Sequence, residues 1–325
     1  MSRCFINELQ DQQSVREIFR ASEKQLRPNR NGKLYLQFHL ADRTGTIGAR
    51  LWNATEEIAS QFDNSDYIRV EGTVQLFQGA LQMIVTKIER VPREEIDEAD
   101  FVQQSRVNVD KTLQRLRELL RELNSPELTT LGECFLMDHD FLNDFCRAPA
   151  GIKLHHAYPG GLLEHSVNMM EVAMQIAPRY PQADRDLLML GAFLHDIGKV
   201  RELAYEDDYS YSDEGQLLGH PVIAVGLFDE KVREAEEFLG EPLSKESVLR
   251  LKHMIVSHHG LLEHGSPKVP MTIEAMMLHL LDTLDSKVAE FERQMFEDPN
   301  PSSPWTFFIP TLGRKLFRGE KRNES

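Results

Sequence analysis

The spacing of apolar residues changes once along the chain, and this change constrains the fold more than any other feature. Between residues 33 and 91 apolar and polar residues alternate, which is typical of strands with one buried face. From about Val109 onward apolar residues recur every three or four positions, which is typical of amphipathic helices. The sequence therefore predicts a multidomain β plus α protein, with a β domain followed by an all-helical domain.

The alternating region predicts a small barrel over residues 1–92. KLYLQFHLAD and TIGARLW alternate cleanly, and DYIRVEGTVQLF and ALQMIVTKIERV read as two further strands joined at Gln78-Gly79. With an earlier strand near SVREIFRAS there are five strands, and NATEEIASQF predicts a short helix between the third and the fourth. This order matches the OB-fold, a Greek-key barrel. The expected core-facing residues are Leu34, Leu36, Phe38, Leu40, Ile47, Ala49 and Leu51.

Residues 93–108 are polar with few apolar anchors and predict a linker. We expect the helical domain over residues 109–325, with helices near 109–124, 127–147, 161–178, 185–197, 220–238, 245–258 and 272–296. The C-terminal tail, PWTFFIPTLGRKLFRGEKRNES, is basic at its end. Two interpretations of this tail stay open, since it either packs across a domain or touches a substrate.

The charge is unevenly distributed. Residues 1–92 carry 12 Lys and Arg against 11 Asp and Glu, a net charge of +1. Because the whole chain carries −15, residues 93–325 carry −16. An acidic body argues against loose, charge-driven binding of nucleic acid, but not against a nucleic-acid enzyme whose acidic residues hold cations.

Three further features bear on location. No apolar run approaches the ~20 residues of a membrane span, and the polar N-terminus shows no secretory signal. Three cysteines, Cys4, Cys134 and Cys146, lack metal-type spacing and fit a reduced protein better than a disulfide framework. We expect a cytoplasmic protein that does not contact membranes.

Histidines and aspartates placed in or at the ends of separate apolar helices predict a metal centre. Mixed imidazole and carboxylate ligands suit divalent Mn, Fe, Zn or Mg, and two such ions ~3.5–4 Å apart activate water and clamp a phosphodiester. Taken singly, a His-Asp pair arises by chance and a helix-borne histidine is often structural. Buried polar groups without partners, however, cost ~1–3 kcal/mol each, which a shared metal would offset. The expected ligands are His165, His195, Asp196, His220, one of His258 and His259, and Asp282.

The flanking motifs, PAGIKLHHAYPGGLLEHS, LGAFLHDIGK, GHPVIAVGL, MIVSHHGLLEHGSPKVP and EAMMLHLLDTLDSK, resemble the HD superfamily of metal-dependent phosphohydrolases between Gly160 and Asp285. With the upstream barrel they resemble, over nearly the whole chain, the YhaM-type 3′-to-5′ exoribonucleases. The resemblance implies that His165, His195, Asp196 and Asp282 bind metal and that His220 and His258 match the extra histidines of two-metal members. Asp282 is favoured over Asp285 as the first Asp of its motif. The cofactor expected is a pair of divalent ions, with Mn²⁺ favoured over Fe²⁺, Co²⁺, Zn²⁺ and Mg²⁺.

Two residues are candidates for a catalytic role beside the metals. Lys199 follows the His-Asp pair by three residues, where it either offsets phosphate charge or is an ordinary solvated lysine. Whichever of His258 and His259 is not a ligand is expected to face the substrate, and we assign His259 this position.

The barrel carries a candidate nucleic-acid face. The alternation places Tyr35, His39, Arg50 and Trp52 opposite the core, on the face that OB-folds use for single strands. Phe77, near a hairpin tip, is a further candidate. The alternative is that Trp52 closes the barrel bottom and Tyr35 covers a domain contact.

Three functions follow as hypotheses. In the first, which takes direction and product from the resemblance, the protein shortens single-stranded RNA, or DNA, from the 3′ end by metal-assisted hydrolysis and releases nucleoside 5′-monophosphates. In the second, the helical domain hydrolyses a free nucleotide or cyclic dinucleotide and the barrel regulates it. In the third, the protein binds single strands without catalysis.

Overall fold

The computed structural model describes residues 3–29, 31–77, 80–101, 107–151, 158–205, 210–296, 298 and 303–319. The chain forms two compact units, Met1–Gln104 together with Phe291–Ser325, and Ser105–Glu290. Residues 291–325 thus group with the first unit, whereas we expected them in the helical domain. Among the described ranges, no helix combines the length and the apolar character that crossing a membrane requires.

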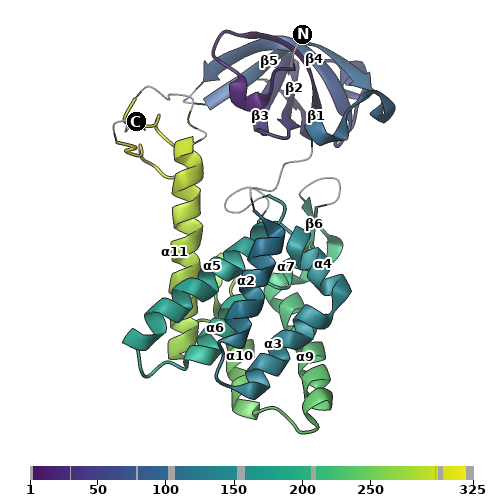
Figure 1. Cartoon of the computed structure of the whole chain (residues 1–325). Coiled ribbons are helices and arrows are strands. Elements are labelled where there is room, and N and C mark those ends of the chain that lie inside the picture. The colour runs from purple at the N-terminus through teal and green to yellow at the C-terminus, as the bar shows by residue number, and fades with distance from the viewer. Residues whose placement is uncertain are drawn as a thin grey trace. The chain divides into compact units, whose positions relative to one another are not determined.

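The first unit contains a closed five-stranded barrel (Figure 1). Its elements are β1 (Ser14–Pro28), β2 (Leu34–Asp42), β3 (Gly45–Trp52), α1 (Glu56–Ala59), β4 (Tyr67–Phe77) and β5 (Ala80–Val91). The strand order is β1-β2-β3-β5-β4, and antiparallel pairing of β4 with β1 closes the ring. The predicted OB-type order, five strands with a helix between the third and fourth, is confirmed. The Gln78-Gly79 connection lies outside the described residues.

Strand alternation determines which side chains fill the barrel. Leu36, Phe38 and Leu40 of β2 are at most 1% exposed, and Ile47, Ala49 and Leu51 of β3 are also buried. Leu34, at the start of β2, is only half-buried. Because successive side chains of a strand point to opposite faces, the residues between them face away from the core. Helix α1 begins at Thr55, whose side chain accepts a hydrogen bond from the Ile58 amide.

The described residues of the second unit are mainly helical and include a short antiparallel strand pair, β6 (Leu203–Ala204) with β7 (Ser210–Tyr211). The helices are α2 (Val109–Arg121), α3 (Pro126–Met137), α4 (His139–Arg147), α5 (Gly161–Ile176), α6 (Arg185–Leu194), α7 (Lys199–Glu202), α8 (Asp213–Leu218), α9 (His220–Leu239), α10 (Lys245–Ser257) and α11 (Ile273–Phe296). Helix α6 is buried from Asp186 to Leu194 and forms the centre of the core. Phe193 of α6 meets Phe135 and Phe145 edge-to-face.

One predicted helix is divided in two. We expected a single helix near 127–147, but Asp138 is extended and its carboxylate accepts a hydrogen bond from the Phe141 amide, so it caps α4. The short elements α7, α8, β6 and β7 were not predicted from the apolar spacing. Of the predicted linker, residues 102–106 lie outside the described residues, and two 3-10 turns, Arg93–Glu95 and Glu98–Asp100, precede them.

Candidate metal centre and nucleic-acid interface

Helix ends bring the candidate ligands together. His195 caps the C-terminal end of α6, His220 is the first residue of α9, and His258 caps the C-terminal end of α10. His165 lies in the second turn of α5 and Asp282 in the middle of α11. These positions come from five different helices of one unit, so the centre depends on how those helices pack.

Close backbone approach is required beside these helix ends. A Cβ atom at Gly198 would lie 2.1 Å from the His220 carbonyl oxygen, and one at Gly260 would lie 2.2 Å from the His279 ring. Gly260 and Gly219 also have φ of +80° and +74°, in the region that favours glycine. Glycine is therefore needed where the chain turns next to the histidines.

The first trio of possible ligands comprises His165, His195 and Asp282, whose donor atoms all lie within 4.8 Å of one another. The Nε2 atoms of His165 and His195 are 3.2 Å apart, and Asp282 Oδ1 lies 3.4 Å from His165 Nε2. Asp285 lies on the other side of His165, where its carboxylate is 2.7 Å from Nδ1. Asp282 therefore lies on the side of His165 that faces His195, and Asp285 contacts the opposite nitrogen of the His165 ring.

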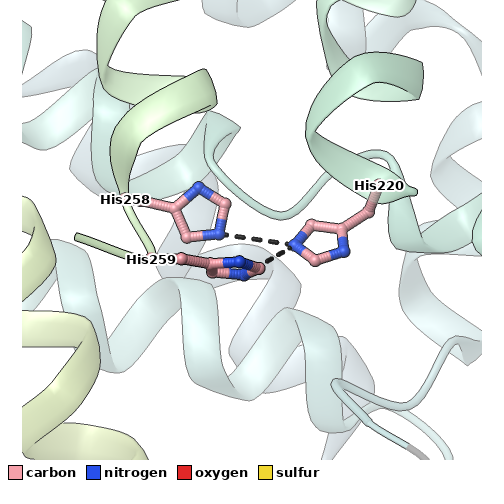
Figure 2. Close-up of side chains that lie close together, drawn as sticks. All are labelled: His220, His258 and His259. Carbon is pink, nitrogen blue, oxygen red and sulfur yellow. Dashed lines mark hydrogen bonds between the residues drawn. The ribbon is translucent and has the colours of Figure 1, made fainter. Parts of the chain in front are cut away.

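The second trio comprises His220, His258 and His259, again with donor atoms within 4.8 Å of one another. Figure 2 shows the three rings turned toward one another, with His220 Nε2 3.4 Å from His258 Nε2 and 3.1 Å from His259 Nε2. Both His258 and His259 are thus close enough to share one ion with His220.

Asp196 lies between the two trios. Its Oδ2 is 3.3 Å from His195 Nε2 and 3.7 Å from His165 Nε2, while Oδ1 is 3.3 Å from His220 Nε2 and 3.6 Å from His258 Nε2. Oδ1 is buried and has no hydrogen-bond partner among the described residues. A buried carboxylate oxygen of this kind is costly unless a ligand satisfies it. The structure thus gives each trio one oxygen of the same carboxylate.

The second nitrogen of each buried ring fixes its orientation. Nδ1 lies 2.9 Å from the Ala192 carbonyl oxygen in His195 and 2.7 Å from the Ile255 carbonyl oxygen in His258. In His220, Nδ1 lies 2.9 Å from Glu202 Oε1, and Glu202 also accepts a hydrogen bond from the His220 amide. Carbonyl and carboxylate oxygens only accept, so these Nδ1 atoms carry the protons and each Nε2 presents a lone pair to the centre.

Nitrogen lone pairs that point at one another indicate whether the site fits a cation. The 3.2 Å Nε2–Nε2 contact between His165 and His195 brings two acceptors together unless a proton or a metal ion lies between them. Burial disfavours a charged His165, but hydrogen bonds with the Asp282 and Asp285 carboxylates raise its pKa to about 9. The donor set and its orientation fit divalent cations.

Lys199 is buried rather than solvated. Its ammonium group donates to Asp196 Oδ2 at 2.7 Å and to the Ala150 carbonyl oxygen at 2.6 Å. Burial opposes both charges, but the pair raises the pKa of Lys199 and holds the pKa of Asp196 well below its usual range. The interpretation of Lys199 as an ordinary solvated lysine is therefore wrong. The ion pair keeps Asp196 ionised and in position between the trios.

His258 and His259 differ in their surroundings. His258 is 1% exposed and its Nδ1 faces the Ile255 carbonyl oxygen, whereas His259 is half-buried and its Nδ1 has no hydrogen-bond partner in the described ranges. Burial lowers the pKa of both rings, in His259 to about 4, so both are neutral at pH 7. The oriented ring of His258 is the better prepared ligand, because no described acceptor fixes the ring of His259 in the same way.

Sequence reasoning missed Glu202 altogether and weighed Asp285 only as a rival ligand. Both are acceptors for the Nδ1 atom of a candidate ligand, His220 and His165 respectively. Glu202 lies 18 positions before His220, so no local pattern indicates the contact. Burial opposes ionisation of Glu202, but its hydrogen bonds with His220 lower its pKa.

On the barrel, four of the five predicted residues lie together. Tyr35 and Trp52 face each other across β2 and β3, with ring centroids 5.2 Å apart. The Arg50 guanidinium carbon lies 5.9 Å from the Trp52 ring centroid and 5.6 Å from that of Phe77. Trp52 is 46% exposed and Phe77 47%, so Trp52 does not close the barrel. The result is an exposed aromatic surface with a cation between its rings.

His39, the fifth predicted residue, pairs elsewhere. Its Nδ1 lies 3.2 Å from Glu23 Oε2 of β1, and both side chains are partly exposed. The aromatic surface of the barrel is therefore Tyr35, Arg50, Trp52 and Phe77, and His39 borders an acidic residue.

Two parts of the chain match known domain families, one in each of the two units. Residues 162–287 match the family described as HD domain, and residues 17–91 match the family described as OB-fold nucleic acid binding domain. HD domains are domains of metal-dependent phosphohydrolases that bind divalent metals, and both trios lie within the matched range.

Among solved structures, the second OB-fold domain of replication protein A from Methanococcus maripaludis is 24% identical over 30% of this chain and 100% of its own, with a TM-score of 0.23. A replication protein A heterotrimer bound to single-stranded DNA is 20% identical over 28% of this chain and 66% of its own, with a TM-score of 0.21. RecG bound to a three-way DNA junction is 12% identical over 56% of this chain and 26% of its own, with a TM-score of 0.25.

Proposed function

We propose that this protein is a metal-dependent 3′-to-5′ exonuclease that acts on single-stranded RNA, or DNA, and releases nucleoside 5′-monophosphates. The observation that carries the proposal is the convergence of two trios of ligands on the two oxygens of Asp196. The match to an HD domain beside a nucleic-acid-binding OB-fold supports a nucleic-acid hydrolase. The resemblance to YhaM-type enzymes supplies the direction and the product.

Six residues would hold two divalent cations: His165, His195, Asp282, His220 and His258, with Asp196 shared. Two such cations, when bound, lower the pKa of water and offset the charge of a phosphodiester. We favour Mn²⁺ among Mn²⁺, Fe²⁺, Co²⁺, Zn²⁺ and Mg²⁺, because the donors mix imidazole with carboxylate.

Other residues position and charge this centre. Lys199 keeps Asp196 ionised, while Glu202 and Asp285 orient the His220 and His165 rings. His259 is neutral at pH 7, and we assign it to the substrate rather than to a metal ion. On the barrel, bases would stack on Tyr35, Trp52 and Phe77, and phosphate would pair with Arg50. These contacts would hold the strand that the helical unit cuts.

A strand of RNA labelled at its 5′ end tests the proposal. With Mn²⁺ we expect a ladder that shortens from the 3′ end, and nucleoside 5′-monophosphates in the supernatant. Asp196→Asn should abolish both while leaving the far-ultraviolet circular dichroism unchanged. A substrate that stays intact with every divalent metal would overturn the proposal. Release of nucleoside 3′-monophosphates would show that the other P–O bond of the phosphodiester is cleaved.

A second candidate is hydrolysis of a free nucleotide or cyclic dinucleotide, with the barrel as a regulator. It is favoured by the position of both trios, which lie entirely within Ser105–Glu290 and need no barrel residue. Trp52→Ala separates the two functions, because it should slow the shortening of long strands under the first and leave turnover of a small substrate unchanged under the second. A non-catalytic binding protein, the third hypothesis, does not account for the full set of ligands.

We also propose a cytoplasmic location. The three cysteines are free thiols in the structure, and Cys134 is buried. Free thiols are usual in a reducing compartment.

A further inference from the structure

The C-terminal segment folds into a small hairpin, which we call the C-terminal lobe, residues 303–319. Isolated bridges pair Trp305 with Phe317 and Ile309 with Arg314. The Thr306 amide donates to the Leu316 carbonyl oxygen at 2.9 Å, and Gly313, with φ of +62°, lies in the turn. The lobe is thus an ordered element, and its buried residues are Thr306, Ile309 and Leu316.

Arg318 links the C-terminal lobe to residues at and just beyond the end of α11. Arg318 donates to the Met295 carbonyl oxygen at 3.2 Å and to Asp298 Oδ1 at 3.1 Å. Asp298 Oδ2 in turn accepts a hydrogen bond from the Phe307 amide. Arg318 and Asp298 therefore neutralise each other within the structure.

The outer surface of the C-terminal lobe carries exposed aromatic rings. Trp305 is 47% exposed, Phe308 53% and Phe317 57%. The rings of Trp305 and Phe317 are 4.8 Å apart and tilted by 49°, so they do not cover each other face to face. Exposed Trp and Phe side chains are rarely left in contact with water without a binding role when they gather in one small element.

The C-terminal lobe is also positively charged. Arg314 and Lys315 are exposed, and neither makes an ion pair with a described carboxylate. Residues 303–319 contain three cations and no acidic residue, in a chain whose net charge is −15. The C-terminal lobe is therefore basic, although the protein as a whole is acidic.

We propose that the C-terminal lobe is a second contact for single-stranded nucleic acid, with bases stacked on Trp305 and Phe317 and phosphates at Arg314 and Lys315. The inference rests on the proposed function, because it assigns a further contact to the same substrate. The barrel shows the same chemistry, a tilted aromatic pair of Tyr35 and Trp52 beside a guanidinium. Aromatic rings with adjacent cations bind single strands without sequence preference.

Tryptophan fluorescence tests the proposal with the C-terminal lobe intact. The chain has two tryptophans, so Trp52→Phe leaves Trp305 as the only indole. We expect an unlabelled 20-nucleotide oligouridylate, added to the full chain in EDTA to prevent hydrolysis, to quench the emission of this variant in a saturable manner. Unchanged emission at concentrations that saturate binding would overturn the proposal.

Affinity measurements provide a second test. By fluorescence anisotropy, Trp305→Ala with Phe317→Ala should weaken oligouridylate binding by about 5- to 150-fold per stacked base. Arg314→Gln with Lys315→Gln should make the dependence of log K on log salt shallower by about 0.7 per phosphate contact. Phe238→Ala, which removes an aromatic ring 73% exposed on α9, is the matched control and should leave the affinity unchanged.

The failure of this inference is distinguishable from that of the proposed function. If the unaltered chain neither binds nor shortens oligouridylate, both are overturned. If it does both, and Trp52→Ala weakens binding while the lobe variants do not, only the role of the C-terminal lobe is overturned. The same conclusion follows if the lobe variants lower the oligomeric state in sedimentation without changing affinity, because the surface is then a protein interface.

Discussion

The carboxylate of Glu202 holds the His220 ring in the candidate metal centre, and we expect Glu202→Gln to weaken metal binding. Oε1 accepts from the His220 amide at 2.8 Å and faces Nδ1 at 2.9 Å, while Oε2 lies 3.0 Å from the same Nδ1. A glutamine can keep one acceptor, but its amide group then directs N–H toward Nδ1–H. The ring can relieve this conflict by moving its proton to Nε2, which removes the lone pair that faces Asp196 and His258.

The size of the effect follows from the loss of one oriented ligand. Replacing the hydrogen-bond acceptor behind a metal-binding histidine costs about 10- to 100-fold in affinity, or about 1.4–2.7 kcal/mol. At a metal concentration 100 times its Kd, the unaltered chain gains about 2.7 kcal/mol of stability. At the same concentration the variant would gain only about 0.4–1.4 kcal/mol. In a unit of this size, 1 kcal/mol shifts Tm by about 2–4 °C.

Thermal unfolding with increasing Mn²⁺ measures this difference. We expect Mn²⁺ to raise Tm of the helical unit by about 5–11 °C in the unaltered chain and by about 1–6 °C in Glu202→Gln. The matched control is Glu214→Gln, because Glu214 forms an exposed ion pair with Arg201 and touches no candidate ligand. If Glu202→Gln and the unaltered chain show the same Mn²⁺ midpoint and the same Tm in EDTA, Glu202 does not set the orientation of His220.

Three further changes test the barrel, the glycine beside the centre and a buried ion pair. Trp52→Ala should raise the Kd for a single-stranded oligonucleotide by about 5- to 150-fold by anisotropy without changing hydrolysis of bis-p-nitrophenyl phosphate, and a parallel fall in both activities would argue against a separate binding surface. Gly198→Ala should cost about 1–3 kcal/mol in urea unfolding, because its Cβ would lie 2.1 Å from the His220 carbonyl oxygen, and an unchanged midpoint would contradict the close packing. Glu274→Gln should cost about 1–3 kcal/mol at pH 7. Burial opposes ionisation of Glu274, but the Asp184 amide and Arg250 hold its pKa below 4.5. Its contribution is therefore present above pH 4.5 and lost as pH falls through the folded pKa, so the gap in urea midpoint should narrow between pH 7 and pH 4, and a constant gap would show that the charge is not responsible.

Alternation along β2 and β3 was enough to predict both faces of the barrel. Phe38 is buried and Tyr35 faces away from the core because a strand with one buried face has a period of two. The partner of His39 could not be predicted, since Glu23 lies on β1 where the register with β2 shifts between Ser22 and Gln25. Such a bulge changes which side chains meet without changing the sequence pattern.

The helical unit was predictable where helix boundaries have local causes. Ser125 accepts a hydrogen bond from the Leu128 amide and Pro126 begins α3, close to the predicted start near residue 127. Asp138 has the same capping role for α4, but it lies between apolar segments whose spacing continues across it. The division of the predicted helix near 127–147 depended on a single carboxylate, which periodicity does not detect.

The structure brings the predicted candidate ligands close together, but the residues that support them were not predicted. Histidines at the ends of apolar helices indicate a shared ligand, because buried imidazoles need partners. The role of Lys199 depends on the Ala150 carbonyl oxygen, 49 positions earlier in the chain, and that of Glu202 on a ring 18 positions later. Contacts of this range follow from the packing of α7 and α9, and no local spacing encodes them.

The two trios differ in charge, and this difference bears on which cations the centre can hold. The first contains the carboxylate of Asp282, whereas the second consists of three imidazoles, of which we assign His220 and His258 as ligands, and an imidazole is neutral when it acts as a ligand. In the second trio the carboxylate oxygen that faces the Nε2 atoms is Asp196 Oδ1, while the Glu202 carboxylate lies behind the His220 ring at Nδ1. Magnesium prefers oxygen ligands, while Mn²⁺, Fe²⁺, Co²⁺ and Zn²⁺ accept imidazole. The second trio therefore selects against Mg²⁺, and loss of the Asp196 charge should affect its cation more than the cation held with Asp282.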